Sequence, residues 1–331
     1  MDVTYYESHS FDPAFNLALE QFLFETRPAG EACMMLWQND NTIVVGKYQN
    51  AVSELDPAYV KEHGIKVVRR LSGGGAVYHD LGNLNFTFIE DDKNDGQLDF
   101  AIFCEPVVLA LRSFGVTAEV NGRNDITIQG KKFSGNSQYI KGGRVMHHGT
   151  VLFDSDLSVL GSALRATGDK YLSKGNASVV SRVTNIKDHL SENVSLEQFK
   201  EALKNEMARN RDIHTLTLSA EDVDTIDAIK SRRYDMWDWN FGVSPEYSVS
   251  KKRRVENCGT IDIRMEVQAG EITAMSIHGD FFGNGEISDV EQRLTGCALQ
   301  EAALLEALAD FPLDSYCRGL SVHQFTEILC T

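Results

Sequence analysis

The sequence has little positive charge for its length. Its 331 residues include 32 Lys and Arg against 48 Asp and Glu, which leaves a formal net charge of -16 at pH 7. An excess of carboxylates of this kind repels phosphate backbones and anionic lipid headgroups. We therefore expect neither nucleic acid nor a membrane among the partners of the protein.

Cysteines are few and scattered, and long apolar runs are missing. The six cysteines contain no CxxC spacing, which favours free thiols in a reducing compartment over a disulfide framework or a zinc site. No segment approaches ~18 consecutive apolar residues, and the opening MDVTYYESHSFDP has neither a basic stretch nor an apolar core. We expect a cytoplasmic protein with no export signal and no membrane span.

Both common nucleotide-binding motifs are also missing. The P-loop pattern GxxxxGK followed by Ser or Thr does not occur, and in RRLSGGGAVYHDLGN (69–83) Tyr78 stands where GxGxxG requires its third glycine. The segment nevertheless contains three consecutive glycines. A glycine triplet forms either a tight turn or a loop whose N–H groups approach a ligand closely, and the triplet alone does not distinguish the two.

Apolar periodicity predicts an α/β (α+β) protein in which strands and helices are mixed. The expected helices and strands are a helix over 13–26, a helix from Asp56 to Gly64, a helix over 100–114, a capping box at Ser195, and strands at 34–38, 42–46, 66–71 and 76–78. Pro106 either kinks the third helix or marks its real first turn. A hairpin is expected around Gly142 and Gly143.

The composition changes near residue 245. Two tryptophans, a glycine and a proline occur in WDWNFGVSPEY (237–247), and two alternating strands joined at Ala269 and Gly270 follow, then helical patterns. About 85 residues are enough for a small core of their own. We predict two domains, 1–246 and 247–331.

Polar residues gather around the glycine triplet and in two later segments. Arg69 and Arg70 would bring guanidinium groups to the mouth of the loop, where a phosphate or carboxylate is held bidentately. The later segments are GRNDITIQGKKFSGNSQ (122–138) and VMHHGTVLF (145–153). Polar side chains packed this densely between strands indicate a binding site.

Five ordered motifs resemble the lipoate-protein ligase A family. They are RRLSGGGAVYHDLGN, GRND, GKKFSGNSQ, HHGTVLF and SVVSRVTN, and the match extends through WDWNFG to the small domain. The resemblance implies a biotin-ligase-like catalytic domain, a mixed β-sheet flanked by helices, with a small α+β accessory domain. It also implies that ATP converts lipoate to lipoyl-adenylate with release of pyrophosphate, and that the lipoyl group then passes to a lysine of an acceptor. The implied acceptors are the glycine-cleavage H protein and acyltransferase subunits of 2-oxoacid dehydrogenases, with Mg²⁺ beside ATP.

The resemblance also assigns roles to residues. Lys132, two residues before the SG of GKKFSGNSQ, matches the catalytic lysine that contacts both lipoate and ATP. The other matches are Arg70, Gly75, Ala76, Val77 and Tyr78 for ATP, and Ser72, Gly73 and Gly74 for lipoate. A cation fits the chemistry, because a carboxylate that attacks a phosphate joins two anions and positive charge must stabilise the transition state.

Five further residues are weaker candidates, namely His79, Asn83, Asp125, His148 and Arg182. His79 either bonds the ligand or is a satisfied structural residue. Asp125 is a weak Mg²⁺ ligand, because one carboxylate is little signal for an ion that keeps several waters. His148 is expected on a strand that lines the pocket, and the segment from Lys174 to Arg182 in a loop that closes over the adenylate.

Other functional classes fit the sequence less well than the ligase. A transferase that acts without ATP needs a cysteine nucleophile, and the chain has none between Cys104 and Cys258, after the lysine motif. A non-catalytic lipoate or biotin binder has no need of Lys132 and Arg70. A biotin ligase would carry an arginine-rich glycine loop, which is not what stands at 69–78. The basic run 251–254 is expected to be a solvated strand edge, with contact to an acidic acceptor as the alternative.

Overall fold

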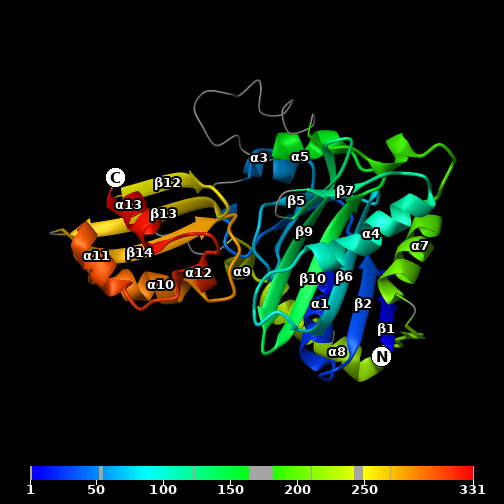
Figure 1. The fold of residues 1–331 in the computed structure, drawn as a ribbon, viewed down its shortest axis with the longest axis horizontal. Coiled ribbons are helices and arrows are strands. Elements are labelled where there is room, and N and C mark those ends of the chain that lie inside the picture. The colour runs from blue at the N-terminus through cyan, green and yellow to red at the C-terminus, as the bar shows by residue number, and fades with distance from the viewer. Residues whose placement is uncertain are drawn as a thin grey trace. The chain divides into compact units, whose positions relative to one another are not determined.

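The computed structural model describes residues 2–51, 55–121, 124–163, 182–209, 211–241, 249–268 and 270–330. The chain forms two compact units, which Figure 1 shows as ribbons. The N-terminal unit comprises Met1–Val44, Val52–Arg69 and Val77–Asn240. The C-terminal unit combines Phe241–Thr331 with two earlier loops, Val45–Ala51 and Arg70–Ala76. The predicted closing loop lies outside the described residues up to position 181.

The segment before residue 242 contains both strands and helices. Its strands are Val3–Glu7 (β1), Ala32–Trp37 (β2), Thr42–Val45 (β3), Lys66–Arg69 (β4), Val77–His79 (β5), Asn83–Asp91 (β6), Glu119–Asn121 (β7), Asp125–Ile128 (β8), Lys131–Lys141 (β9), Arg144–Leu152 (β10) and Ile213–Thr215 (β11). Its helices are Pro13–Thr26 (α1), Pro57–Glu62 (α3), Ala101–Ser113 (α4), Leu157–Ala163 (α5), Ile186–His189 (η1, 3₁₀), Leu196–Ala208 (α7), Ala220–Ile229 (α8), Lys230–Tyr234 (η2, π) and Trp237–Phe241 (α9).

A mixed eight-stranded sheet organises the N-terminal unit. Its order is β11-β1-β2-β6-β10-β9-β8-β7, and a smaller sheet has the order β4-β3-β5. Strand β1 pairs in parallel with β2 and β11, whereas every pairing from β2 across to β7, in the order β2-β6-β10-β9-β8-β7, is antiparallel. Residues 142 and 143 join β9 to β10, so the predicted hairpin and the predicted mixed sheet are confirmed.

Helices cover both faces of the large sheet. Adjacent residues of a strand point to opposite faces, and the two histidines of β10 show which helix covers each face. The His147 ring stacks on Phe103 of α4 with centroids 4.8 Å apart, whereas His148 bonds Glu20 of α1. The sheet therefore lies between α1 on one side and α4 on the other, with α8 against α1 and α7 against α4 (Figure 1).

The predicted helix starts are confirmed, and one alternative is settled. Asp12 caps α1 by accepting a hydrogen bond from the Ala14 N–H, and Ser195 and Gln198 form the capping box of α7. Pro106 lies inside α4, so it does not mark the first turn. A proline there leaves the carbonyl four residues earlier without its helical donor, and the guanidinium of Arg209 donates to that carbonyl, Ile102 O, at 3.0 Å.

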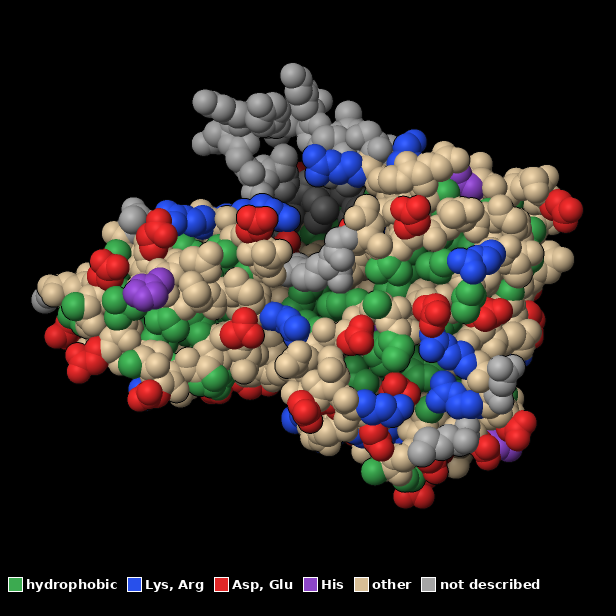
Figure 2. Space-filling model, viewed as in Figure 1, with side chains coloured by type: hydrophobic (Ala, Val, Ile, Leu, Met, Phe, Trp, Pro, Cys, Tyr) green, Lys and Arg blue, Asp and Glu red, His purple; other side chains and the backbone are tan. Residues whose placement is uncertain are grey.

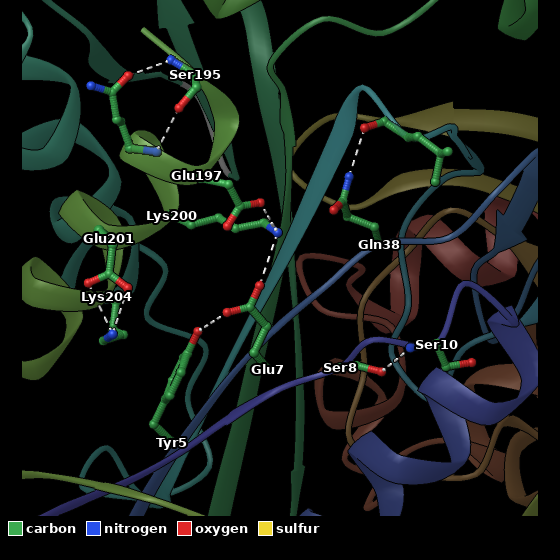
Figure 3. A network of polar contacts seen from close by, with 12 residues as sticks. Tyr5, Glu7, Ser8, Ser10, Gln38, Ser195, Glu197, Lys200, Glu201 and Lys204 are labelled. Carbon is green, nitrogen blue, oxygen red and sulfur yellow. Dashed lines mark hydrogen bonds and ion pairs between the residues drawn. The ribbon is translucent and has the colours of Figure 1, made fainter.

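A polar network ties α7 to the sheet. Figure 3 shows Lys200 of α7 pointing toward Glu7 of β1, with Nζ–Oε1 at 3.0 Å, while its Nζ also bonds Glu197 at 2.8 Å. Burial alone would raise the pKa of Glu7, but hydrogen bonds from Lys200 and Tyr5 outweigh burial and lower it. Burial would lower the pKa of Lys200, but its bonds to Glu197 and Glu7 outweigh burial and raise it. Both charges are therefore stabilised in the folded protein.

The C-terminal unit has its own sheet and core. Its elements are Val249–Val255 (β12), Gly259–Gln268 (β13), Glu271–Gly279 (β14), Ile287–Leu294 (α10), Glu301–Ala307 (α11), Leu313–Tyr316 (α12) and Val322–Cys330 (α13). The strands pair antiparallel in the order β12-β13-β14. The predicted pair of strands joined between 268 and 271 is confirmed by β13 and β14, but a third strand was missed, because residues 256–258 form a further turn in which Asn257 has φ 64 and which separates β12 from β13. Arg253 of the basic run pairs with Glu327 at 3.0 Å.

Tyr48 completes the core of the C-terminal unit from a distant part of the sequence. Its ring stacks on Phe281 with centroids 4.7 Å apart, and its hydroxyl donates to the carbonyls of Gly283 and Gly285. On the face drawn in Figure 2, carboxylates and basic side chains are interspersed over both units. Among the helices that the structure describes, none has the length and apolarity needed to cross a membrane.

Candidate active site

Lys132 and Asp125 form an ion pair on the large sheet. Lys132 lies near the start of β9 and Asp125 opens β8, and the distance from Nζ to Oδ1 is 2.7 Å. Their side chains are 37% and 38% exposed, so the pair is open to a ligand rather than sealed in the core. The backbone of Lys132 is fixed by a second segment, since its N–H donates to Arg182 O and its carbonyl accepts from the Thr184 N–H.

The predicted residues Lys132, Asp125 and Arg182 are thus brought together by pairing of their segments. Asp125 faces Gly135 in the β8–β9 register, and an irregularity between Ile126 and Thr127 brings Lys132 opposite Thr127. Arg182 contributes its carbonyl, while the residue itself is exposed. Lys132 is therefore a half-exposed cation at a position of β9 whose backbone is hydrogen-bonded to a further segment.

A buried polar network runs through the same face of the sheet as α1. The carboxylate of Glu20 lies 2.9 and 3.0 Å from His148 Nδ1, and it accepts a 2.6 Å hydrogen bond from Thr87 Oγ1. Trp37 Nε1 in turn donates to Thr87 Oγ1 at 2.9 Å. His148 was predicted to line the pocket, and it lies on the strand as expected, but Glu20 and Trp37 were not singled out from the sequence.

His79 and Asn83 belong to a neighbouring group of buried amides. His79 is 2% exposed, and its Nδ1 lies 3.1 Å from Asn39 Nδ2 and 3.5 Å from Asn85 Nδ2. An amide nitrogen only donates, so Nδ1 accepts and the proton is carried on Nε2. Asn83 Nδ2 donates to Asn85 Oδ1 at 3.0 Å. These contacts support the structural alternative for His79, because its ring is fixed from within the fold.

Tyr78 and Val77 lie on β5 at the border of the small sheet. Val77 pairs with Val44, and the Tyr78 hydroxyl donates to Asn41 Oδ1 at 3.1 Å. Burial, followed by the nearby charge of Asp80, raises the pKa of Tyr78 to about 12. Tyr78 is therefore a neutral hydrogen-bonding group at neutral pH.

The other predicted ligand residues lie on the loop that belongs to the C-terminal unit. Arg70 is buried, and its guanidinium donates to Ser72 Oγ, Gly73 O and Gly75 O at 3.1, 2.6 and 2.9 Å. Ser72 is also buried and accepts from the Lys47 N–H at 2.8 Å, whereas Gly75 is exposed and Ala76 is half-buried. Arg70 thus fixes the conformation of the loop by donating hydrogen bonds to carbonyls of the loop itself.

The glycine triplet packs against the small domain through its backbone. The Gly74 N–H donates to Phe281 O at 3.3 Å, and a Cβ on Gly73 would stand 2.4 Å from the same oxygen. Gly74 has φ +90 and lies beside the Phe282 ring, and a Cβ on Gly46 would stand 1.9 Å from Gly74 O. Bare backbone at 46, 73 and 74 is therefore needed for contacts within the protein itself, whatever else the loop binds.

Arg69 corrects one expectation. Its guanidinium does not lie free at the mouth of the loop but donates to Trp239 O and Asn240 O, at 2.8 and 2.9 Å. The Asn240 side chain accepts from the Arg69 N–H, and burial lowers the pKa of Arg69 to about 10. Arg69 ties β4 to α9 and is part of the fold, which doubled arginines in a sequence do not reveal.

The thiols of the N-terminal unit are inert. Cys33 and Cys104 are fully buried, and burial raises the pKa of each thiol to about 12. The thiolate is the nucleophilic form of cysteine, so neither side chain is activated. Among the described residues there is likewise no group of three or more His, Cys, Asp or Glu arranged to hold a metal ion.

Two family models together match most of the chain. Residues 12–208 match the lipoyl protein ligase A/B catalytic domain, and residues 244–329 match the bacterial lipoate protein ligase C-terminus. The chain is 40% identical over 321 residues to lipoate-protein ligase LplJ of Bacillus subtilis strain 168, covering 96% of this chain and 97% of that protein. The chain belongs to the lipoate-protein ligase family. The predicted enzyme class, a ligase, is thereby confirmed.

Solved structures agree with this assignment. P. falciparum LipL1 shares the fold, with a TM-score of 0.75 at 24% identity and coverage of 94% of both chains. A bi-partite lipoate protein ligase of Thermoplasma acidophilum, described with its E2 lipoyl domain, has a TM-score of 0.67 at 27% identity, covering 75% of this chain and 98% of that one. A lipoate-protein ligase A bound with ATP has a TM-score of 0.64 at 25% identity and covers 74% and 100%. The predicted fold, a mixed sheet flanked by helices with a small second domain, is confirmed.

Proposed function

We propose that the protein activates lipoate with ATP and then transfers the lipoyl group to a lysine of an acceptor domain. The observation that carries the proposal is Lys132, a half-exposed ammonium on a strand whose backbone is fixed, in a chain of the ligase family. The lipoate carboxylate attacks the α-phosphate, pyrophosphate leaves, and the acceptor amine then displaces AMP from the mixed anhydride. Both steps build up negative charge that a positioned cation stabilises.

The proposed roles follow the motifs. Lys132 is the catalytic residue and contacts both lipoate and ATP. We assign Arg70, Gly75, Ala76, Val77 and Tyr78 to ATP, and Ser72, Gly73 and Gly74 to lipoate. His79, Asn83 and His148 act as supporting residues, because each is buried and bonded within the fold. Arg182 contributes through the carbonyl that fixes Lys132.

Mg²⁺ is the proposed companion of ATP. Asp125 offers one half-exposed carboxylate, which fits an ion that takes one or two protein ligands and completes its shell with phosphates and waters. When bound, the ion would neutralise charge on the phosphates. In the structure Asp125 pairs with Lys132, so this carboxylate would serve as one ligand beside the phosphates and not as a preformed cage.

The proposed acceptors are the glycine-cleavage H protein and acyltransferase subunits of 2-oxoacid dehydrogenases. The lipoyl domain described with the archaeal ligase supports this class of partner. Six free cysteines support a cytoplasmic location. The proposed domains are 1–246 and 247–331, supported by the family match that begins at 244 and by the division between Asn240 and Phe241.

One assay separates the candidate classes. The protein is incubated with ATP, Mg²⁺ and lipoate, with and without an acceptor domain or its lysine-to-arginine variant, and both pyrophosphate and acceptor mass are followed. We expect lipoate-dependent pyrophosphate release and a lipoyl adduct only on the acceptor that keeps its lysine. An adduct formed from an acyl-carrier thioester without ATP would make the protein a transferase, and lipoate binding without either product would make it a binder.

A further inference from the structure

Gly135 has a property that none of the assigned roles explains. A Cβ built on it would stand 2.9 Å from Lys132 Nζ and 3.0 Å from Lys132 Cε, and its third nearest atom would be Thr150 Oγ1 at 3.9 Å. Contacts between 3.4 and 4 Å are ordinary, so among the residues that the structure describes the tip of Lys132 is the one obstacle to a Cβ here. The lysine therefore lies across the bare backbone of Gly135 before it reaches Asp125.

The backbone conformation at position 135 does not require glycine. Gly135 lies within β9, and its φ is not in the positive range that favours glycine. Glycine inside a strand is unfavourable, because it has no side chain to pack and loses more chain entropy than other residues. Its N–H donates to Thr150 Oγ1 and its carbonyl accepts from the same hydroxyl, contacts that any residue can make.

We propose that Gly135 is a positioning residue for Lys132, and that it is glycine in order to leave room for the end of the lysine side chain. In that position the ammonium is held by Asp125, which faces Gly135 across the β8–β9 pair. The inference rests on the proposed function of Lys132. The new element is that a residue further along the same strand determines where the lysine side chain lies.

The direction of the effect follows from which atoms must move. In Gly135→Ala the atoms that give way are the last carbon and the nitrogen of a flexible side chain, so the strand stays in place and Lys132 shifts by a fraction of an ångström or leaves Asp125. A displacement of ~1 Å at a catalytic group lowers a rate by up to about 10²-fold. Adenylate formation should fall about 10- to 100-fold in kcat, while the KM for lipoate stays within about threefold and the Tm is unchanged.

The kinetic test is a double-mutant cycle on the full chain. Pyrophosphate release is measured for wild type, Gly135→Ala, Lys132→Ala and the double variant. We expect Gly135→Ala to have no further effect once the lysine is gone. An equal loss in the presence and absence of Lys132, a wild-type rate, or failure of Gly135→Ala to fold would each overturn the proposal.

Gly149→Ala on β10 is the matched control for folding. There a Cβ would stand 2.3 Å from Asn136 Oδ1 and 2.5 Å from the Phe86 ring, both inside the core, so this variant should lower the Tm where Gly135→Ala does not.

A second readout does not depend on activity. Lysines are labelled by reductive ¹³C-methylation, and the Lys132 resonance is identified by its absence in Lys132→Ala. In Gly135→Ala this resonance should move toward the shifts of exposed lysines, whereas an unmoved resonance would overturn the proposal. If wild type releases no pyrophosphate while the resonance moves, the proposed function fails and the positioning contact stands.

Discussion

Replacing Gly73 with alanine tests what the glycine triplet is for. The added Cβ would stand 2.4 Å from Phe281 O, 3.2 Å from Phe282 Cα and 3.3 Å from Phe281 C, against 3.4 Å where ordinary contact begins. All three atoms are backbone. A flexible side chain can rotate away, but a backbone can only shift as a segment, and the Gly74 N–H bond to Phe281 O would be strained by that shift.

The expected magnitude comes from two opposing terms. Inserting one methyl group into a packed contact costs about 1–3 kcal/mol. Exchanging glycine for alanine where φ permits stabilises by about 0.4–1 kcal/mol through the unfolded chain, and Gly73 does not have a positive φ. We therefore expect Gly73→Ala to lower the free energy of unfolding by about 1–2 kcal/mol.

Gly75→Ala is the matched control, because its Cβ would meet no atom of the described residues within 4 Å. It should be neutral or slightly stabilising. Denaturant unfolding and hydrogen exchange of residues 70–76 and 279–282 are measured for both variants, together with lipoate affinity. If Gly73→Ala keeps wild-type stability and wild-type exchange at 279–282 yet loses lipoate affinity, the loop does not pack on Phe281 as described, and bare backbone serves the ligand alone.

Three further predictions concern the N-terminal unit. Lys132→Ala should lose about 2–4 kcal/mol of transition-state stabilisation in pyrophosphate release, whereas Lys131→Ala should not; a near-normal rate with a normal melting curve excludes the role. Lys132→Ala should lower the free energy of unfolding by no more than about 1 kcal/mol, because both partners of the ion pair that it removes are more than a third exposed. Lys200→Met should lower the free energy of unfolding by about 1 kcal/mol. Because the pKa of Glu7 is lowered in the folded protein, the stability that the ion pair contributes is lost as pH falls through that pKa. Because the pKa of Lys200 is raised, the same stability is lost as pH rises through the pKa of Lys200. The difference in stability from wild type should therefore be largest between about pH 5 and 10. A pH-independent difference would contradict the ion-pair account. Asn240→Ala removes the hydrogen bond that the buried Arg69 N–H donates to the Asn240 side chain and should cost about 1–3 kcal/mol in denaturant unfolding; no measurable loss would mean that this bond is replaced by water.

Periodicity and caps predicted most of the elements. The helix over 13–26, the hairpin at 142–143 and the capping box at Ser195 follow from local rules, and local rules suffice where one helix end or one tight turn is decided by adjacent residues. The third strand of the small sheet was missed because its turn depends on Asn257 in a left-handed conformation, which has no strong sequence signal.

The candidate site was predicted in part, for a different reason. Motifs located Lys132 and Arg70, but contacts between distant segments are not written in any short string. Glu20 is the clearest example: it is a buried glutamate on α1, and its bonds to Thr87 and His148 join three elements. A lone acid at a buried helical position was the available signal. Gly73 gave no such hint, because its partner Phe281 lies in the small domain.

The position of Tyr48 has a consequence for how the chain is made. Its hydroxyl bonds a carbonyl 235 residues further along, so on the ribosome the ring emerges long before the strands that will surround it exist. Closing so long a loop slows assembly, because its entropy is lost before the contact forms. The small domain can therefore complete its core only after its own strands and helices have been synthesised, around an aromatic residue that lies far upstream in the chain. A fragment that begins at residue 249 would lack the Tyr48 ring and would have a cavity beside Phe281 in its core. A separate peptide that contains Tyr48 would supply the missing ring.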